Sequence, residues 1–369
     1  MRSVAKSLES AGKTLLLGLV SAFLSRPRAL PDWRSRQYRV LYVRHDGIGD
    51  MILATGTIRA IARSHPTLKL DVLTHTKTAD MLQGNPYLDH VIAFKPGRRL
   101  AYPTSVLRSI RRRRYDVVVD GMMRRFVDGA VQRPRVKSST VWLMAISGAP
   151  HRIGMGGRPN DFIYTNAVIP PSELSVHHAE YCAAVAVPFG VNPARVNLDC
   201  ELHISDAERQ SAEAFWKEIQ VSKQKARLLV NVSAANERRR WPLDRYISVI
   251  QHVLARKLGA VVVVIGAPGE EADILSVASA SRCTAHVPGL REAFALVATA
   301  DVLLTPETSL GHAAAALGTP VVVLLPAGHE MLVPYQATGR NLFGADGTIG
   351  SVSAESATCA LDEVMDALA

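Results

Sequence analysis

The chain has few of the features that mark disulfide-bonded, zinc-binding or membrane-spanning proteins. Its four cysteines lie far apart and form no CxxC pair, which argues against a zinc site and is typical of reduced thiols in a cytosolic protein. No apolar run reaches the roughly twenty residues that span a bilayer. We find no short-period repeat, no low-complexity tract and no GxGxxG dinucleotide fingerprint. What remains is a globular protein whose chemistry must come from particular loops.

The longest apolar stretch lies near the N-terminus, within residues 1–38. The segment KTLLLGLVSAFLSRPR, residues 13–28, is apolar with basic flanks but too short to cross a membrane. We expect this N-terminal extension to form a helix that lies on an anionic membrane surface. A helix that packs over the first domain is an equal alternative. A signal peptide with a cleavage site near Val20-Ser21-Ala22 ranks third.

The length and the charge distribution predict two domains with different partners. With 369 residues the chain is too long for one compact core. Residues 1–190 hold 28 Lys and Arg against 13 Asp and Glu, a balance of +15, and residues 191–369 hold 15 against 20, a balance of −5. A basic first half favours an anionic partner such as nucleic acid, a phospholipid or a phosphorylated glycolipid.

Hydrophobic patterning predicts an α/β protein with two Rossmann-like, doubly wound parallel-sheet domains facing a central cleft. Short β-branched runs alternate with helical stretches, which indicates parallel strands covered on both faces. Strands are expected at 39–44, 70–75, 90–94 and 115–121, and again at 227–233, 260–266, 301–307 and 320–326. Helices are expected at 50–64, 77–83 and 103–113, and again at 243–257, 270–280, 291–299 and 309–318.

This pattern divides the chain into five parts. They are the N-terminal extension (1–38), a first domain (39–190), a linker region (191–225), a second domain (226–350) and a C-terminal segment (351–369). The last segment contains a predicted helix at 353–368, which we expect to pack back across both domains.

The loop HDGIGD, residues 45–50, joins the first strand to its helix. Gly47 and Gly49 permit a tight turn with positive φ and a close approach of the backbone. Asp50 has two open interpretations. The spacing alone favours an N-cap of the helix, and the alternative is a general base that takes a proton in the cleft. Asp46, in the same loop, is interpreted as a turn residue.

The segment TPETSLGHAAAALGTP, residues 305–320, predicts a phosphate-binding helix start. Glu307, Thr308 and Ser309 follow a strand and open an alanine-rich helix. The first N–H groups of a helix have no internal partners and lie at the positive end of its dipole, so they bind phosphate readily. His312, one turn later, can point at the same anion. The alternative is a capped core helix with a hydrogen-bonded histidine.

Arginines in NVSAANERRRWPLDRY, residues 231–246, follow the first strand of the second half. Arg239 and Arg240 suit a diphosphate there, because a guanidinium grips phosphate with paired donors. A solvated basic loop is the alternative. After the next strand, GAPGEE places Glu270 and Glu271 where a carboxylate either accepts from ribose hydroxyls or simply begins a helix.

Arginines are also dense in the first half. The run RRRRYD, residues 111–116, is joined by Arg98, Arg99, Arg124 and Arg125. Nucleic acid is disfavoured as the partner, because no nucleic-acid-binding module is recognisable. An anionic lipid headgroup or a phosphorylated sugar acceptor fits this charge equally well.

Taken in order, these motifs resemble glycosyltransferase family 9, the heptosyltransferases of lipopolysaccharide core assembly. RHDGIGD resembles the family's opening loop, which ends in Gly-Asp before a helix. RRRWP resembles its basic loop ending in Trp-Pro, and ETSLGH its Asp-Thr-Gly-x-x-His helix start. GNPYLDHVIAF (84–94), HRIGMG (151–156) and GAPGEE also match. The resemblance covers roughly residues 39–369.

The resemblance implies the GT-B fold and an inverting glycosyltransferase that needs no metal or other cofactor. The first domain would bind the acceptor, with Asp50 as the catalytic base, and the second domain would bind the nucleotide sugar. Arg239 takes the place of the family's phosphate-neutralising lysine, with Arg240 beside it. The other implied donor contacts are the backbone N–H groups of Thr308, Ser309 and Leu310, the side chain of His312, and Glu270 on the ribose.

The chain departs from the family at two positions beside the donor sugar, where Glu307 replaces an Asp and Ser309 replaces a Gly. The implied donor is ADP-heptose, and another ADP- or NDP-sugar is the alternative. The implied acceptor is a lipopolysaccharide core or a similar anionic envelope glycan, reached from the cytoplasm at the inner membrane. A nucleotide-binding scaffold protein without catalysis is a different class of function that stays open.

Overall fold

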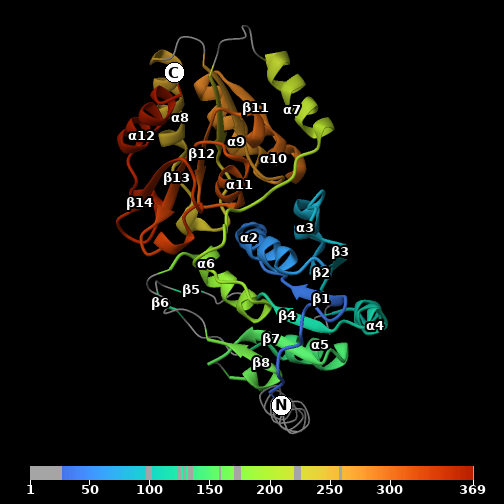
Figure 1. The fold of residues 1–369 in the computed structure, drawn as a ribbon. Coiled ribbons are helices and arrows are strands. Elements are labelled where there is room, and N and C mark those ends of the chain that lie inside the picture. The colour runs from blue at the N-terminus through green and yellow to red at the C-terminus, as the bar shows by residue number, and fades with distance from the viewer. Residues whose placement is uncertain are drawn as a thin grey trace, which may run out of the picture.

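The structure, a computed structural model, has two α/β domains stacked one on the other, as Figure 1 shows. It describes residues 27–96, 102–122, 126–127, 130–131, 136–157, 159–169, 176–219, 226–256 and 260–368. Most of the predicted N-terminal extension lies outside the described residues, as do Arg98, Arg99, Arg124 and Arg125. Among the helices in the described ranges, none is long and apolar enough to cross a membrane.

The first domain is built on six parallel strands in the order β3-β2-β1-β4-β7-β8. The strands are β1 (Tyr38–Val43), β2 (Leu68–His75), β3 (His90–Phe94), β4 (Val117–Asp120), β7 (His151–Met155) and β8 (Asn166–Val168). The helices are α2 (Ile48–Ser64), α3 (Thr76–Ala79), α4 (Thr104–Arg113), α5 (Ser138–Ser147) and α6 (His178–Ala183). Short 3-10 helices are η1 (Asp80–Leu82), η2 (Asp161–Ile163) and η3 (Ala184–Phe189), and β5 (Phe126–Val127) and β6 (Ala130–Val131) form a separate antiparallel ribbon.

The second domain repeats this plan with the order β11-β10-β9-β12-β13-β14, again all parallel. The strands are β9 (Arg227–Asn231), β10 (Val261–Ile265), β11 (Thr284–His286), β12 (Val302–Pro306), β13 (Val321–Pro326) and β14 (Gly339–Gly344). The helices are α7 (Asp206–Ile219), α8 (Leu243–Arg256), α9 (Glu271–Ser281), α10 (Leu290–Thr299), α11 (Ser309–Leu317) and α12 (Ala354–Asp366). Both sheets therefore have the doubly wound Rossmann order, as the sequence predicted.

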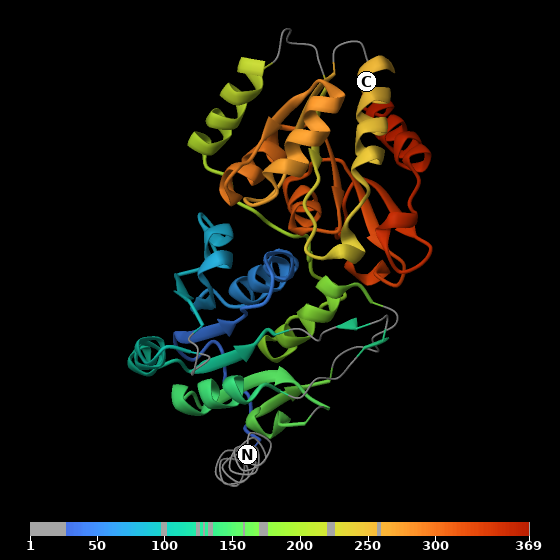
Figure 2. The same ribbon diagram turned by 180° about the vertical axis from the view of Figure 1, so that it is seen from behind.

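The strands are apolar because each sheet is covered on both faces. Along β1, Val40 and Tyr42 join one hydrophobic core while Leu41 and Val43 join another, since successive side chains of a strand point to opposite faces. The core that contains Val40 continues into the second domain and includes Phe294 of α10. The two domains thus share a core, on the side where α2 faces α11 in Figures 1 and 2.

The predicted linker region, 191–225, contains a helix that packs on the second domain. Helix α7 runs along α10. Its Trp216 is fully buried and donates the indole N–H to Thr299 Oγ1 at 3.0 Å. Glu213 of α7 also accepts from Arg227 at the start of β9, at 2.9 Å. By its packing, the second domain begins with α7.

The C-terminal helix corrects one expectation. We expected it to pack across both domains, but its buried residues, such as Leu361 of α12, join the core of the second domain with Val253 of α8 and Leu324 of β13. The predicted strands are present within a few residues of their expected limits, and β7, β8, β11 and β14 were not predicted. Three of these four lie at sheet edges, where half-exposed residues replace the continuous apolar run of a central strand.

Candidate active site

The candidate site lies where the N-terminal ends of α2 and α11 meet. Each sheet reverses its winding direction beside its first strand, between β1 and β4 and between β9 and β12. Ligands of such sheets bind at this point, outside the carboxyl ends of the strands. The loop after β1 leads into α2, the loop after β12 leads into α11, and these helices pack against each other across the two domains.

Gly49 lies where these two helices approach each other closely. A Cβ atom placed on it would lie 2.8 Å from Cδ2 of His312 and 3.6 Å from Cα of Ser309. The predicted close approach of the backbone is therefore confirmed. The predicted positive φ is wrong, because α2 begins at Ile48 and Gly49 is part of the helix, while its N-cap Gly47 has a φ of −69°.

Asp50 is the third residue of α2, within its first turn, rather than its N-cap. Its Oδ2 accepts the backbone N–H of the N-cap residue Gly47 at 3.1 Å, so it stabilises the helix start from within. The side chain keeps 38% of its surface exposed. Asp50 therefore combines the two interpretations that the sequence left open, since it satisfies the helix start and still presents a carboxylate oxygen to the site.

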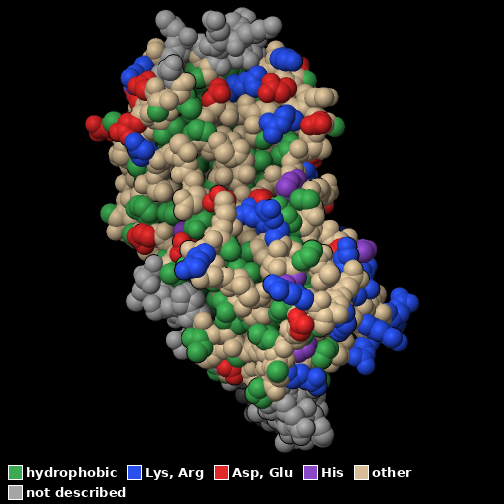
Figure 3. All heavy atoms as spheres, in the orientation of Figure 1, with side chains coloured by type: hydrophobic (Ala, Val, Ile, Leu, Met, Phe, Trp, Pro, Cys, Tyr) green, Lys and Arg blue, Asp and Glu red, His purple; other side chains and the backbone are tan. Residues whose placement is uncertain are grey.

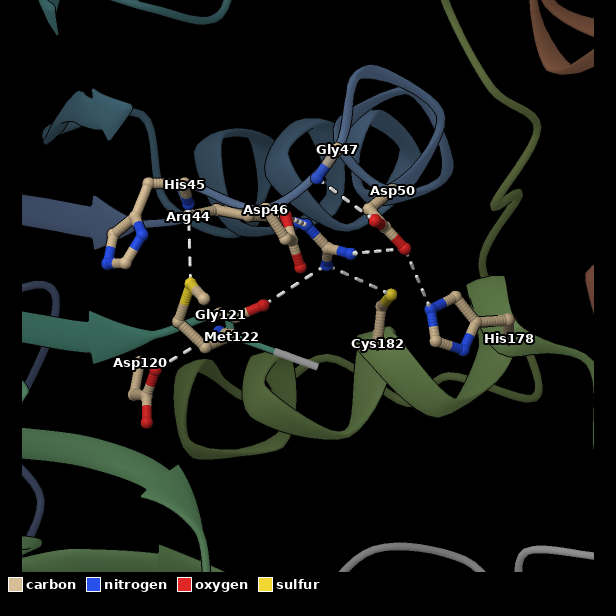
Figure 4. A network of polar contacts seen from close by, with 10 residues as sticks. All are labelled: Arg44, His45, Asp46, Gly47, Asp50, Asp120, Gly121, Met122, His178 and Cys182. Carbon is tan, nitrogen blue, oxygen red and sulfur yellow. Dashed lines mark hydrogen bonds and ion pairs between the residues drawn. The ribbon is translucent and has the colours of Figure 1, made fainter. Parts of the chain in front are cut away.

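A fully buried arginine lies beneath this carboxylate, as Figure 4 shows. Arg44 donates its Nε–H to Asp46 Oδ1 at 3.0 Å and an Nη1–H to the carbonyl oxygen of Gly121 at 3.1 Å. Its Nη1 also lies 3.4 Å from Sγ of Cys182, and its Nη2 lies 3.8 Å from Asp50 Oδ1. The network joins the ends of β1 and β4 to α6 and places one fixed positive charge between two carboxylates.

This arrangement separates the pKa values of the two aspartates. Burial raises the pKa of Asp46 to about 6, and the charge of Asp50 adds to the rise. Burial would raise the pKa of Asp50 as well, but the nearby His178 imidazole and the Arg44 guanidinium lower it to about 2. Asp50 is therefore ionised at neutral pH, which is the state that a general base requires.

The helix start on the second domain is capped by Thr308. Its Oγ1 accepts the Leu310 N–H at 3.3 Å and is also held by Asn231 Nδ2 at 3.2 Å and by Thr305 Oγ1 at 3.0 Å. The Leu310 N–H, which the resemblance assigned to a diphosphate, thus has a partner within the protein. Ser309 occupies the first position of the helix, directly opposite Gly49.

His312 faces α2 from one turn further along α11. It is 8% exposed, and its Nδ1 is buried without a hydrogen-bond partner among the described residues. Burial lowers its pKa to about 4, and the positive charge of Arg239 contributes to the lowering. His312 is therefore a neutral imidazole at the junction of the two domains, with polar capacity left for a ligand.

The two predicted phosphate-binding arginines point to different carboxylates. Arg239 forms an ion pair with the buried Glu307, with 3.1 Å between its Nη2 and Oε1, while Oε2 of Glu307 lies 2.6 Å from Nδ1 of His329. Arg240 instead pairs with Asp273 at 2.7 Å and with Glu270, whose Oε1 lies 3.5 Å from its Nη2. Arg239 and Glu307 thus lie together beside α11, and Arg240 and Glu270 form a separate group at the start of α9.

Sequence reasoning missed the contribution of α6. Its residues His178 and Cys182 contact Asp50 and Arg44, and His177, its N-cap, contacts the second domain. The only sequence signal is the His-His pair at 177–178 before the linker, and nothing in it indicates proximity to Asp50. No group of three or more His, Cys, Asp and Glu residues that could hold a metal ion occurs within the part of the chain that the structure describes.

Known proteins share this sequence pattern and fold. The family model for glycosyltransferase family 9 (heptosyltransferase) matches residues 104–342. Lipopolysaccharide heptosyltransferase 2 of Salmonella typhimurium is 24% identical over 335 residues, which cover 82% of this chain and 87% of that protein. Among solved structures, the family 9 glycosyl transferase from Veillonella parvula has a TM-score of 0.76 at 18% identity and covers 90% of this chain and 98% of its own. The ADP-heptose LPS heptosyltransferase II of E. coli has a TM-score of 0.68 at 17% identity, with coverage of 90% and 100%.

Proposed function

This chain belongs to glycosyltransferase family 9, and from this membership we propose that it transfers a heptose from ADP-heptose to a hydroxyl group of a lipopolysaccharide core acceptor. It is a glycosyltransferase with the GT-B fold that its motifs predicted. The proposed donor and acceptor are those printed in the names of its relatives. The observation that carries the proposal is the meeting of Asp50, on one domain, with the start of α11, on the other.

The second domain supports the donor assignment. The start of α11 offers the positive end of a helix dipole, Arg239 lies beside it, and His312 brings a ring nitrogen, Nδ1, that has no hydrogen-bond partner among the described residues. A nucleoside diphosphate is an anion that a helix N-terminus and an arginine can bind together. Arg239 is paired with Glu307 in this structure, so we propose that the diphosphate competes with this carboxylate for the guanidinium.

The proposed reaction is a single displacement with inversion at the anomeric carbon. Asp50 takes the proton of the acceptor hydroxyl, whose oxygen attacks the anomeric carbon from the face opposite the nucleotide. The new C–O bond forms as the bond to the β-phosphate oxygen breaks, and the leaving diphosphate carries away the electron pair. Arg239 and the α11 helix start stabilise the negative charge that develops there, so we propose that no divalent ion is required.

Donor identity is the part of the proposal that Glu307 and Ser309 affect most. Both replace a smaller family residue beside the donor sugar. Glu307 is held between Arg239 and His329, so its carboxylate is fixed and does not swing freely. A preference for another ADP- or NDP-sugar would be consistent with the same fold and the same base.

The nucleotide is tested first, by calorimetry of the purified protein against ADP, UDP, GDP and TDP. We expect binding of ADP alone, weakened about tenfold or more by Arg239→Ala and much less by its neighbour variant Arg240→Ala. Turnover with ADP-heptose is then compared for the wild-type protein and Asp50→Asn. Loss of turnover by about 100-fold or more, with ADP binding unchanged, is the expected result. An active Asp50→Asn protein would refute the role of Asp50, and failure to bind any nucleotide would favour the scaffold alternative.

We also propose that the first domain contacts an anionic membrane surface on the cytoplasmic side. Helix α4 ends in Arg111, Arg112 and Arg113 and has no acidic residue in its first turn. Basic side chains gather at the edge of the first domain in Figure 3, where Figure 1 shows α4. Attraction of such a cluster to anionic lipid is worth roughly 1 kcal/mol per charge.

Flotation with vesicles that contain anionic phospholipid tests this contact. The double variant Arg108→Gln/Arg112→Gln removes two exposed charges of α4. Its control, Arg63→Gln/Lys77→Gln, removes two exposed charges from α2 and α3. We expect the first variant to bind vesicles roughly tenfold more weakly or worse, and the control to lose less. Equal binding by the two variants would show that α4 is not the contact surface.

A further inference from the structure

Two adjacent histidines at the start of α6 have partners in different domains. His178 lies beside Asp50, with 3.6 Å between its Nε2 and Oδ1 of the carboxylate. His177 lies 2.8 Å, through its own Nε2, from the backbone carbonyl oxygen of Val333 in the second domain. Helix α6 packs directly against α2, the helix that carries Asp50. One short helix therefore contacts both the base and the opposite domain.

The hydrogen bonds of His177 determine its protonation state. Its Nδ1 accepts the Ala179 N–H at 3.1 Å and so caps α6, which requires that this nitrogen carry no proton. The proton is then on Nε2, which donates it to Val333. Burial lowers the pKa of His177, in keeping with this neutral form. The cap of α6 and the contact with the second domain thus depend on the same tautomer.

Tyr335 of the second domain makes two further contacts with α6 and its N-cap. The ring of Tyr335, two residues after Val333, lies 4.7 Å from the ring of His177. The Tyr335 hydroxyl donates to Glu180 Oε1 at 3.3 Å. A movement between the domains would therefore act on the first turn of α6, where His178 is the next residue.

His178 is buried, with 2% of its surface exposed, and Asp50 is the carboxylate that it faces. Among the described residues, the other charged or titratable groups that interact with Asp50 include Arg44 and Asp46 from the loop after β1, Cys182 from α6 and His312 from α11. Arg44 is held by Asp46 and by the Gly121 carbonyl oxygen, both in the loops after β1 and β4, with Cys182 of α6 as a third partner. His178 and His312 are the contacts most open to change, and His178 lies within ion-pair distance of Asp50.

We propose that α6 couples domain closure to the catalytic base, with His178 as the residue that positions Asp50 and His177 as the contact that senses the second domain. At 3.6 Å the His178–Asp50 pair is just longer than a hydrogen bond, and catalytic hydrogen bonds often shorten only in the ligand complex. Closure on the nucleotide sugar would press the Val333–Tyr335 segment on α6 and bring the imidazole onto the carboxylate. This inference rests on the proposed role of Asp50 as the base.

The test compares the pH profile of kcat among variants of the full chain. His178→Leu removes the imidazole, and we expect kcat to fall about tenfold to 100-fold with the Kd for ADP within about twofold of wild type. The acidic limb of the profile should move to higher pH, because a carboxylate that loses a stabilising donor holds its proton more tightly. His178→Gln keeps an N–H donor and should restore much of the rate.

The coupling itself is tested at His177. His177→Ala keeps the His178 and Asp50 side chains but removes both the contact with Val333 and the Nδ1 cap of α6, and we expect the same direction of shift in the acidic limb. His65→Ala is the matched control. It removes a similar contact, between His65 Nε2 and the Phe189 carbonyl oxygen at 3.0 Å, that lies within the first domain. Thermal unfolding of each variant checks that the fold is retained.

The outcomes separate this inference from the proposed function. If the wild-type protein transfers no sugar, or if Asp50→Asn is fully active, the role of Asp50 as the base fails and the inference fails with it. If wild type and Asp50→Asn behave as proposed but His178→Leu leaves the pH profile unchanged, only the positioning role is overturned. If His178→Leu shifts the profile but His177→Ala behaves like His65→Ala, the coupling between the domains is overturned.

Discussion

Replacing Asp46 by asparagine gives a test of the charge arrangement around Asp50, because the expected change in stability has an unusual sign. Asp46 holds the Nε of the fully buried Arg44 at 3.0 Å, a contact that would ordinarily be expected to stabilise the fold when the carboxylate is ionised. Burial nevertheless raises the pKa of Asp46 to about 6, and the negative charge of Asp50 adds to the rise. The folded protein therefore binds a proton at Asp46 more tightly than the unfolded protein does.

The magnitude follows from this pKa. An ordinary aspartate has a pKa of about 4, so the rise is roughly two units, equivalent to about 3 kcal/mol. Because the folded state binds the proton more tightly than the unfolded state, this stabilisation is fully present below about pH 4 and is lost as the pH rises through about 6. Asparagine has the shape of the protonated form and does not titrate. Asp46→Asn should match wild type at low pH and exceed its free energy of unfolding by up to about 3 kcal/mol at pH 7.5.

Urea unfolding at pH 4.5, 6.0 and 7.5, followed by tryptophan fluorescence, measures this difference. Asp80→Asn, a change at an exposed aspartate of η1, serves as the control and should show no such trend. A difference between Asp46→Asn and wild type that does not grow between pH 4.5 and 7.5 would refute the reasoning. A variant less stable than wild type at pH 7.5 would show that the Arg44 contact outweighs the cost of burying two charges.

Two other substitutions probe the junction of the domains. Gly49→Ala places a methyl group 2.8 Å from Cδ2 of His312, so we expect the helix ends to separate and kcat/KM to fall about tenfold. As a control, the methyl group of Gly289→Ala meets nothing within 4 Å, and this variant should keep kcat/KM within about twofold of wild type. Equal values of kcat/KM for the two variants would contradict this expectation. Glu307→Gln removes the carboxylate that is paired with Arg239 at 3.1 Å and that we propose competes with the diphosphate. Calorimetry should therefore show that ADP binds threefold to tenfold more tightly to this variant. An unchanged Kd for ADP would show that Glu307 and the diphosphate do not compete for Arg239.

The fold was largely predictable from the sequence because its central strands carry a strong signal. The run RVLYVR at 39–44 has four consecutive hydrophobic residues between two arginines, and the strand it predicts is buried on both faces of the sheet. Strand β14 could not be predicted in the same way. It is an edge strand of its sheet, and most residues of its sequence GRNLFG are half-exposed or exposed. Such a strand does not need the continuous apolar run by which a central strand is recognised.

The site was predictable only where its chemistry is local. The Gly-Asp loop and the start of α11 each carry their residues within one turn of a helix, and both lie at the junction of the domains. The divergence of Arg239 and Arg240 depends on which carboxylates the fold brings near them, and neighbouring positions in the sequence do not contain that information. The contact between His178 and Asp50 likewise forms only when α6 packs on α2.

The division of the site between two domains separates two groups that both carry negative charge. In the proposed reaction the carboxylate base and the diphosphate leaving group are both anions, and both must lie close to the same sugar. Here Asp50 is neutralised from below by Arg44, which no ligand can reach because it is fully buried, while Arg239 lies on the other domain beside the α11 helix start. In the proposed complex Asp50 is paired with Arg44, which it shares with Asp46, the diphosphate is paired with Arg239, and each anion has its own helix dipole. Because the cation of Asp50 is already in place before any ligand binds, the diphosphate competes for Arg239 with Glu307 and not with Asp50, and domain closure can bring the two anions together.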